Sequence, residues 1–237
     1  MKLPRASRYR SAPVWPDLVI FDCDGVLVDS ERLTVDVEAR VLTELGWPIT
    51  PDEVVERFVG RSSASMLAEV ERRLGRELTE QFDVTSTIEI RSAFETRLEA
   101  VEGIADLLDA IDAAGVPTCV ASSGSHEKMR ATLGITGLWD RFDGRIFSAD
   151  EVAHGKPAPD LFVHAAARMD VDPAGCAVVE DSPFGVQAAI AAGMTAYGFT
   201  GGLAADGVLA AAGAILFANM SDLVDLLDAP RPPRVEG

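Results

Sequence analysis

The stretch LVIFDCDGVLVDSE, residues 18–31, decides the fold of this chain. Its short apolar run ends at Phe21, and the acidic residues Asp22 and Asp24 follow at once. A run of this kind is typical of a buried strand in a parallel sheet, which presents its last side chains at the edge where ligands bind. Two carboxylates therefore emerge together at a strand tip. Their repulsion requires a bound cation or a shared proton to offset it.

The alternation of side chains along a strand refines this interpretation. If the strand geometry continued, Asp22 and Asp24 would share one face, while Cys23 would point into the apolar layers. One carboxylate could then attack a substrate while the other moves protons. Asp and Gly are also ordinary turn residues, so this motif alone is equally compatible with a polar turn.

Three other apolar or turn segments end in polar residues that phosphate chemistry requires. Hydroxyls and free N–H groups ahead of a helix can bind an anion, although they also serve as plain helix caps. A lone lysine is usually a solvated surface charge. These three segments are SSGS at 122–125, Lys156 in HGKPAPD at 154–160, and Glu180 with Asp181 after the run 177–179. Together with the first motif, they indicate a phosphate site.

Taken together, these motifs resemble the haloacid dehalogenase superfamily, in the branch that contains beta-phosphoglucomutase and small sugar-phosphate phosphatases. The resemblance extends from about residue 18 to about residue 227. It implies a Mg²⁺-dependent phosphomonoester hydrolase that acts on a small phosphorylated metabolite, such as a sugar phosphate, through an aspartyl-phosphate intermediate. The residues that carry it are FDCDGVLVDSE (21–31), VASSGS (120–125), GKPAPDLF (155–162) and VVEDSPFGVQAAIAAGM (178–194).

The resemblance also implies a role for each motif residue. Asp22 would be the nucleophile, and Asp24 would be the general acid and then the general base. Ser122 and Lys156 would hold the phosphoryl oxygens, with Ser123 and Gly124 completing the anion cradle. Oxygen ligands suit Mg²⁺; those expected here are Asp22, the backbone carbonyl of Asp24, Asp181, and Glu180 directly or through water.

The rest of the chain alternates strands and helices, with one interruption. Alternation predicts a doubly wound, Rossmann-like parallel sheet covered by helices on both faces. The interruption, residues 30–100, contains only amphipathic helical patterns and is expected to be an inserted all-helical cap domain. The α/β core would comprise 17–29 and 101–228, with loose tails at 1–15 and 229–237. The expected strands are 18–22, 117–121, 145–148, 176–179, 195–199 and 214–217.

A cap inserted after the nucleophile strand would cover the catalytic edge and select the leaving group. The segment FVGRSS, residues 58–63, is the expected contact, because its glycine lets a loop approach and Arg61 could bind a second anionic group. The start of a surface helix with a solvated arginine explains the same segment equally well.

Two departures from the family bear on the reaction. Beta-phosphoglucomutase has a histidine where this chain has Thr34, and its basic residue after the serine motif is replaced by Ser125 and His126. Both departures favour a phosphatase, with a phosphomutase of the beta-phosphoglucomutase type as the alternative. A phospho-accepting, receiver-like signalling or binding domain is the alternative from another class, but it would leave the helical insertion unexplained.

Composition limits the partners. The net charge of −17 leaves no basic patch for nucleic acid, and no apolar run is long enough for a membrane span. The three cysteines, Cys23, Cys119 and Cys176, lie in or beside apolar strands, which is typical of reduced thiols and predicts a cytoplasmic protein. A monomer is the default expectation, and the expected partner is a small phosphorylated metabolite.

Overall fold

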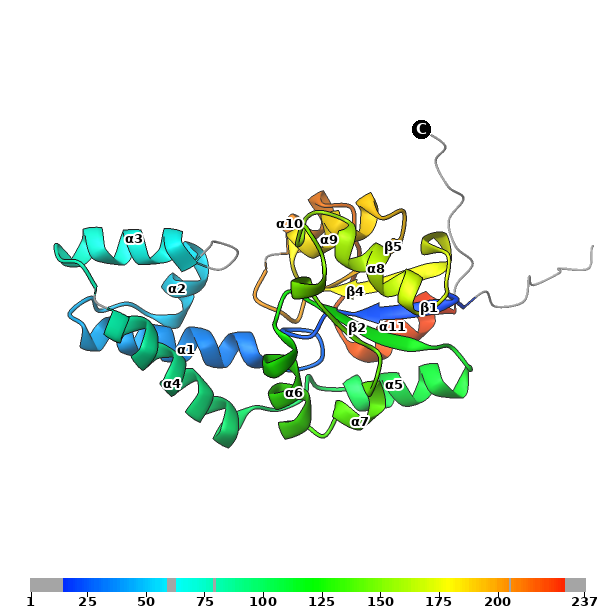
Figure 1. Cartoon of the computed structure of the whole chain (residues 1–237), viewed down its shortest axis with the longest axis horizontal. Coiled ribbons are helices and arrows are strands. Elements are labelled where there is room, and N and C mark those ends of the chain that lie inside the picture. The colour runs from blue at the N-terminus through cyan, green and yellow to red at the C-terminus, as the bar shows by residue number, and fades with distance from the viewer. Residues whose placement is uncertain (1–14, 59–62, 79, 205, 229–237) are drawn as a thin grey trace, which may run out of the picture.

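The computed structural model describes residues 15–58, 63–78, 80–204 and 206–228. The apolar runs form a six-stranded sheet in the order β3-β2-β1-β4-β5-β6, in which every neighbouring pair is parallel. The predicted doubly wound fold is therefore confirmed (Figure 1). The strands are β1 (Leu18–Phe21), β2 (Thr118–Ser122), β3 (Ile146–Ser148), β4 (Cys176–Glu180), β5 (Thr195–Phe199) and β6 (Ile215–Phe217).

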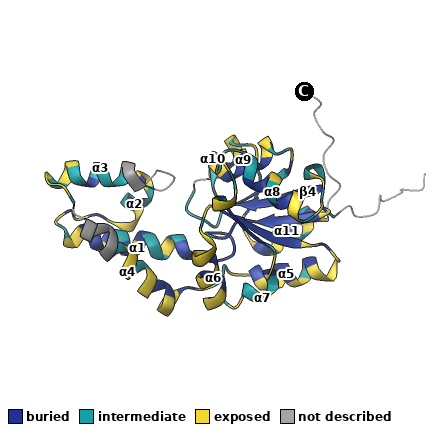
Figure 2. Ribbon diagram, in the orientation of Figure 1, coloured by how far each residue is buried: buried dark blue, intermediate teal, exposed yellow. Residues whose placement is uncertain are grey.

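Helices cover both faces of the sheet because successive side chains of β1 point to opposite sides. Val19 and Phe21 pack into one core cluster, and Leu18 and Ile20 pack into the other. All four side chains are fully buried, as the dark strands in Figure 2 show. The first cluster lies against α5 (Ile104–Ala113), α6 (His126–Ile135), α7 (Trp139–Phe142) and α11 (Met220–Leu227), and the second against α8 (Asp160–Arg168), α9 (Pro183–Ala191) and α10 (Asp206–Ala211).

The helical insertion lies between β1 and α5 and extends to one side of the sheet (Figure 1). It contains α1 (Ser30–Glu44), α2 (Pro51–Phe58), α3 (Ser63–Leu74) and α4 (Glu80–Arg97). Among the described residues from 30 to 99, none belongs to a strand. Leu42, Trp47 and Phe58 are buried in an apolar cluster that is formed by the insertion alone, apart from a contact with Leu203.

Two chain segments connect the insertion to the sheet, and they are hydrogen-bonded to each other. The amide of Asp29 donates to the carbonyl of Glu99 at 3.0 Å, and the amide of Val101 donates to the carbonyl of Leu27 at 3.0 Å. These contacts lie directly beyond the loop that carries Asp22 and Asp24. The insertion is therefore anchored beside the two acidic residues.

The strands extend further toward the site than the apolar runs indicate. Ser122 pairs with Ser148 across β2 and β3, and Glu180 pairs with Gly198 across β4 and β5. Backbone pairing thus continues for one residue beyond the last apolar side chain. As a result, both polar residues are held by the sheet itself.

No helix in the described part of the chain is long and apolar enough to cross a bilayer.

Candidate active site

Three buried carboxylates meet at the carboxyl ends of the two central strands. Asp22 follows β1, Glu180 ends β4 and Asp181 follows it, and the exposed fractions are 7%, 0% and 3%. One carboxylate oxygen from each lies within 4.8 Å of the others. The register explains the meeting, because Phe21 is paired with Val179 and the amide of Asp22 donates to the Val179 carbonyl at 3.0 Å.

Lys156 supplies the positive charge at this cluster. Its Nζ lies 2.5 Å from Asp22 Oδ1 and 2.6 Å from Glu180 Oε1, and it donates to the Ala121 carbonyl at 3.1 Å. The side chain is only 6% exposed. Burial works to lower the pKa of Lys156, but the Asp22 and Glu180 carboxylates outweigh it and raise the pKa. The lysine is therefore a fixed ammonium group between two acids.

One lysine does not neutralise three carboxylates. Burial, opposed by Lys156 and reinforced by Glu180, raises the pKa of Asp22 to about 7. Burial also raises the pKa of Asp181 well above its usual value, with further contributions from Glu31, Glu180 and Asp22. Like charges in a desolvated site produce such shifts when no cation offsets them. The cluster is thus built around a charge that the side chains alone do not balance.

Asp181 has the features of a cation ligand. Its Oδ2 is buried and has no hydrogen-bond partner among the described residues. Buried carboxylate oxygens are normally paired, bound to a metal or protonated. A hard cation coordinated by Asp22, Asp181 and Glu180 would satisfy this atom, and Mg²⁺ prefers such oxygen ligands. The residues present therefore fit the expected metal.

Two glycines let the backbone approach the carboxylates closely. A Cβ atom on Gly25, which has a φ of 77°, would lie 1.9 Å from Asp181 Oδ2. A Cβ atom on Gly185, in the first turn of α9, would lie 1.8 Å from Glu180 Oε1. Glu180 cannot retreat freely, since its other oxygen accepts from the amide and hydroxyl of Ser182 at 3.0 and 2.8 Å. Any side chain at these two positions would displace an acid of the cluster.

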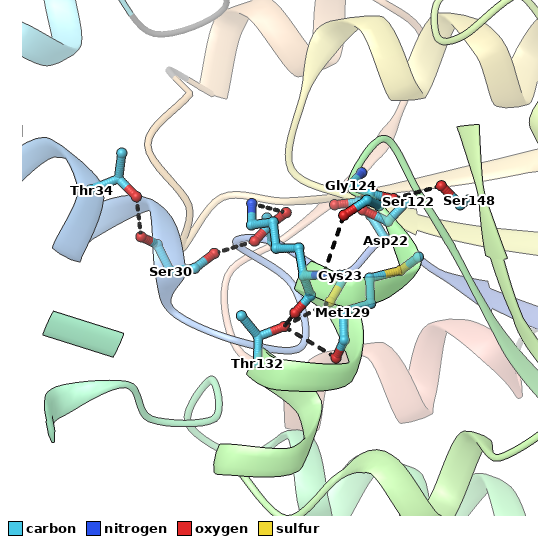
Figure 3. Close-up of polar contacts among 12 residues, drawn as sticks. Asp22, Cys23, Ser30, Thr34, Ser122, Gly124, Met129, Thr132 and Ser148 are labelled. Atoms are coloured by element: carbon cyan, nitrogen blue, oxygen red, sulfur yellow. Dashed lines mark hydrogen bonds and ion pairs between the residues drawn. The ribbon is translucent and has the colours of Figure 1, made fainter. Parts of the chain in front are cut away.

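The serine turn lies beside Asp22 (Figure 3). Ser122 is 1% exposed, and its Oγ accepts from the Gly124 amide at 3.1 Å. Ser148 Oγ donates to the Gly124 carbonyl at 2.8 Å, which fixes the turn from the neighbouring strand. Ser123 is exposed. Ser125 caps α6 by accepting from the Lys128 amide at 3.3 Å. Ser125 is therefore a helix cap, and Ser122 and Ser123 are the serines of the motif that remain for the predicted cradle.

Asp24 is held by two side chains that sequence reasoning missed. Ser30 Oγ donates to Asp24 Oδ1 at 2.5 Å, and Lys128 Nζ lies 2.7 Å from Asp24 Oδ2. Ser125 and His126 stand where the mutase has its basic residue, but Lys128 brings a basic group to Asp24 from the first turn of α6. A lysine in the first turn of a helix, where the dipole disfavours cations, was the available signal.

Two residues of the insertion were considered from the sequence, Arg61 and Thr34. Arg61 lies outside the described residues. Thr34, at the position of the mutase histidine, donates its hydroxyl to the Ser30 carbonyl at 2.9 Å within α1. Figure 3 shows Ser30 and Thr34 together on α1, across from Asp22. Glu31, also missed, is close enough to the acids that burial and then the Asp24 carboxylate raise its pKa to about 7.

Comparison with known proteins gives consistent results. The family model for haloacid dehalogenase-like hydrolases matches residues 16–193. A 6-phosphogluconate phosphatase of Escherichia coli K12 is 35% identical over 184 residues, which cover 77% of this chain and 82% of that protein. A solved haloacid dehalogenase-like protein of Agrobacterium tumefaciens is 36% identical, with a TM-score of 0.81. The match covers 89% of this chain and 97% of that protein's chain.

A further solved structure includes ligands. The haloacid dehalogenase family hydrolase of Deinococcus radiodurans R1, with bound phosphate and sodium, is 31% identical with a TM-score of 0.81. The match covers 93% of this chain and 100% of the Deinococcus chain. The similarity to solved structures therefore spans the sheet and the helical insertion together.

Proposed function

The chain belongs to the haloacid dehalogenase-like hydrolases and is a phosphatase of that family, and on this premise we propose that it hydrolyses a small phosphorylated metabolite with Mg²⁺ as cofactor. The E. coli relative is named as a phosphatase of a sugar-acid phosphate, which supports a sugar phosphate or similar compound as substrate. The intermediate would be a phosphoryl group on Asp22.

The contact between Lys156 and Asp22 is the observation that carries the proposal. A nucleophilic carboxylate must meet an anionic phosphoryl group, and the fixed ammonium group 2.5 Å away offsets their repulsion. Asp22 also lies at the topological switch of a parallel sheet, between β2 and β4, where ligands bind in such folds. Charge and position therefore both favour attack by this residue.

The proposed reaction has two displacements at phosphorus. A carboxylate oxygen of Asp22 forms a bond to phosphorus, the ester bond breaks, and Asp24 gives a proton to the departing alcohol oxygen. Asp24 then takes a proton from water, the water oxygen bonds to phosphorus, and the bond to Asp22 breaks. Orthophosphate and the free carboxylate of Asp22 result. Asp24 ends with the proton that it began with.

Several groups would hold the phosphoryl oxygens during these steps. We assign Ser122, Ser123, Gly124 and Lys156 to this role, with Arg61 as a further substrate contact. Mg²⁺ held by Asp22, Asp181, Glu180 and the Asp24 carbonyl would supply a Lewis acid that offsets the negative charge on the phosphoryl group. Ser122, Ser123, Gly124, Lys156 and Arg61 would each act at an oxygen rather than at phosphorus itself.

The insertion would act as a cap over this site. We propose residues 30–100 as the cap domain and 17–29 with 101–228 as the core, because the hydrogen-bonded segments at 27–29 and 99–101 connect the two. Cap residues would exclude water and select the alcohol that leaves. The thiols of Cys23, Cys119 and Cys176 are buried and form no disulfide, which supports a cytoplasmic protein, and a monomer suffices for the proposed chemistry.

The decisive test is phosphate release from a panel of sugar phosphates, sugar-acid phosphates and nucleotides, with Mg²⁺ or with EDTA. We expect turnover that requires both Mg²⁺ and Asp22, measured against the Asp22→Asn variant. The panel includes beta-glucose 1-phosphate with its bisphosphate activator. Formation of glucose 6-phosphate without phosphate release would instead establish a phosphomutase. Turnover that survives EDTA or the Asp22→Asn change would contradict the proposed mechanism.

A further inference from the structure

The chain contains three lysines, and two of them reach the candidate active site. Lys156 contacts Asp22 and Glu180. Lys128 contacts neither of these residues and instead lies 2.7 Å from Asp24 Oδ2. The two ammonium groups are therefore divided between the two acids of the first motif. One is placed at the proposed nucleophile and the other at the proposed proton donor.

Both oxygens of the Asp24 carboxyl group are engaged. Ser30 Oγ binds Oδ1 at 2.5 Å, and Lys128 Nζ binds Oδ2 at 2.7 Å. The two donors come from different parts of the fold, since Ser30 begins α1 of the insertion and Lys128 lies in α6 beside the sheet. A carboxyl group held at both oxygens cannot rotate freely about its terminal bond. A carboxyl group that must present one oxygen in a fixed direction requires such an arrangement.

Helix stability does not explain Lys128. It is the third residue of α6, where the positive end of the helix dipole disfavours a cation. Its backbone amide is already satisfied by Ser125. Partial burial works to lower the pKa of Lys128, but the Asp24 carboxylate outweighs it and raises the pKa. Asp24 is thus the partner that offsets an otherwise unfavourable position.

The stem of Lys128 follows the serine turn. A Cβ atom on Gly124 would lie 3.5 Å from Lys128 Cδ and 3.7 Å from Asp24 Oδ2, so both side chains lie close to the turn. The lysine is 43% exposed and Asp24 is 17% exposed. The pair is therefore more exposed to solvent than Lys156 and Asp22, whose side chains are 6% and 11% exposed.

We propose that Lys128 is a positioning residue, which aims the Asp24 carboxyl group at the ester oxygen of the substrate. The inference rests on the proposed function and adds a residue to it. Lys128 fixes the direction of Asp24 and takes no proton in the reaction. Asp24 is then already oriented when it transfers its proton to the leaving oxygen, so less conformational freedom is lost on reaching a productive geometry.

The test compares two substrates that differ in their need for a proton. The p-nitrophenolate leaving group departs as a stable anion, whereas the phenolate of phenyl phosphate benefits strongly from protonation. For Lys128→Met we expect kcat/KM with phenyl phosphate to fall by about 100-fold, at the lower end of general acid catalysis. With p-nitrophenyl phosphate we expect a fall of only a few fold. Lys128→Arg should restore most of the loss.

Three reference variants make the result interpretable. Asp24→Asn should show the same selective loss, because it removes the acid itself. Arg130→Met removes a cation from the same helix, where the Arg130 guanidinium lies 5.0 Å from the centre of the Trp139 ring. It should leave kcat/KM unchanged for both substrates. Lys128→Gln keeps a polar side chain and replaces Lys128→Met if that variant does not fold. Thermal unfolding of each variant checks that the fold is retained.

The outcomes separate the inference from the proposed function. Selective loss in both Asp24→Asn and the Lys128 variants supports the positioning role. An equal loss for both substrates with a raised KM would overturn it and make Lys128 a phosphate contact. Unchanged kinetics in Lys128→Met and Lys128→Gln would also overturn it. If Asp24→Asn itself shows no selective loss, the acid role in the proposed function fails, and the role of Lys128 fails with it.

Discussion

Lys156 Nζ lies 2.5 Å from Asp22 Oδ1, although the two residues are separated by 134 positions in the sequence. The ammonium group is 6% exposed and also contacts Glu180 at 2.6 Å. A buried ammonium group between two carboxylates is a strong electrostatic constraint, because removing it leaves both acids unpaired. The same contact prepares Asp22 to meet an anionic substrate. Stability and the proposed catalysis therefore depend on one side chain.

Replacing Lys156 tests this dependence. We expect Lys156→Met to lower the free energy of unfolding by about 3 kcal/mol, the cost of leaving buried charges uncompensated. We also expect kcat to fall by about 100-fold or more, the typical effect of losing one group that stabilises transition-state charge. Urea unfolding and steady-state phosphate release measure the two effects. A variant with unchanged stability in EDTA would show that the ion pair contributes little to the fold.

Removing the charge of Asp181 should have the opposite effect on the metal-free protein. Its Oδ2 is buried without a hydrogen-bond partner among the described residues, so ionisation there is unfavourable. We expect Asp181→Asn to raise the free energy of unfolding in EDTA at pH 7.5 by about 1–2 kcal/mol. The same variant should lose most of the stabilisation that Mg²⁺ gives the wild type. Thermal unfolding with and without Mg²⁺ measures both. Equal Mg²⁺ stabilisation of variant and wild type would contradict the assigned ligand.

The stability of the metal-free protein should depend on pH in a direction that the Asp22 pKa fixes. Burial raises this pKa from 3.8 in the unfolded chain to about 7 in the folded protein. Between these values the folded state binds more protons than the unfolded state, so stability falls as pH rises. Asp22 alone should contribute a loss on the order of 3 kcal/mol between pH 4 and pH 7 in EDTA. Glu31 and Asp181, whose pKa values are also raised by burial, contribute in the same direction.

The control for this pH dependence is Asp22→Asn, which should show a shallower decline over the same range. Glu151 contributes in the opposite direction. Its pKa is lowered despite partial burial, because the Ser148 amide, His164 and His126 bind the carboxylate. Saturating Mg²⁺ should also flatten the wild-type profile, since the cation favours the ionised cluster. An equally steep decline in Asp22→Asn would mean that another group controls the pH dependence.

Gly185 provides a test of the geometry around Glu180. A Cβ atom there would lie 1.8 Å from Glu180 Oε1, so Gly185→Ala must displace a fully buried acid. We expect an activity loss of about 10-fold or more and weaker Mg²⁺ dependence, because a ligand and the Lys156 contact both shift. Titration of activity with Mg²⁺ measures the change. Gly134→Ala is the matched control, since that exposed helical glycine has open space around it. It should retain full activity and gain about 0.5 kcal/mol of stability.

The sheet and its polar tips could be predicted because each depends on local sequence. An apolar run that stops at Asp22 or Glu180 identifies both a strand and the residue that it presents at the ligand-binding edge. Parallel pairing then brings these tips together without further information. The helical insertion was predicted for a related reason, since no alternating pattern interrupts its amphipathic helices.

The contacts between tips could not be predicted in this way. Lys128 and Asp24 meet because α6 starts at one particular angle after the serine turn, and that angle depends on Ser125 and on Ser148 beneath the turn. Nothing local to Lys128 indicates its partner, which is 104 positions away. The need for Gly185 comes from the turn between β4 and α9, where Ser182 binds both Glu180 and the Gly185 amide and so brings the glycine against the acid. Three-dimensional packing determines such pairs, while local pattern determines the elements that carry them.

The proposed phosphoryl group on Asp22 is the central claim and can be tested directly. The enzyme is mixed with excess substrate, found with the panel above, and Mg²⁺, then quenched in acid within milliseconds and digested for mass spectrometry. We predict one added phosphoryl group on the peptide that contains Asp22, and no such group in Asp22→Asn or after addition of EDTA. Phosphate release by the wild type with no phosphorylated peptide at any quench time, together with activity retained in Asp22→Asn, would contradict the account.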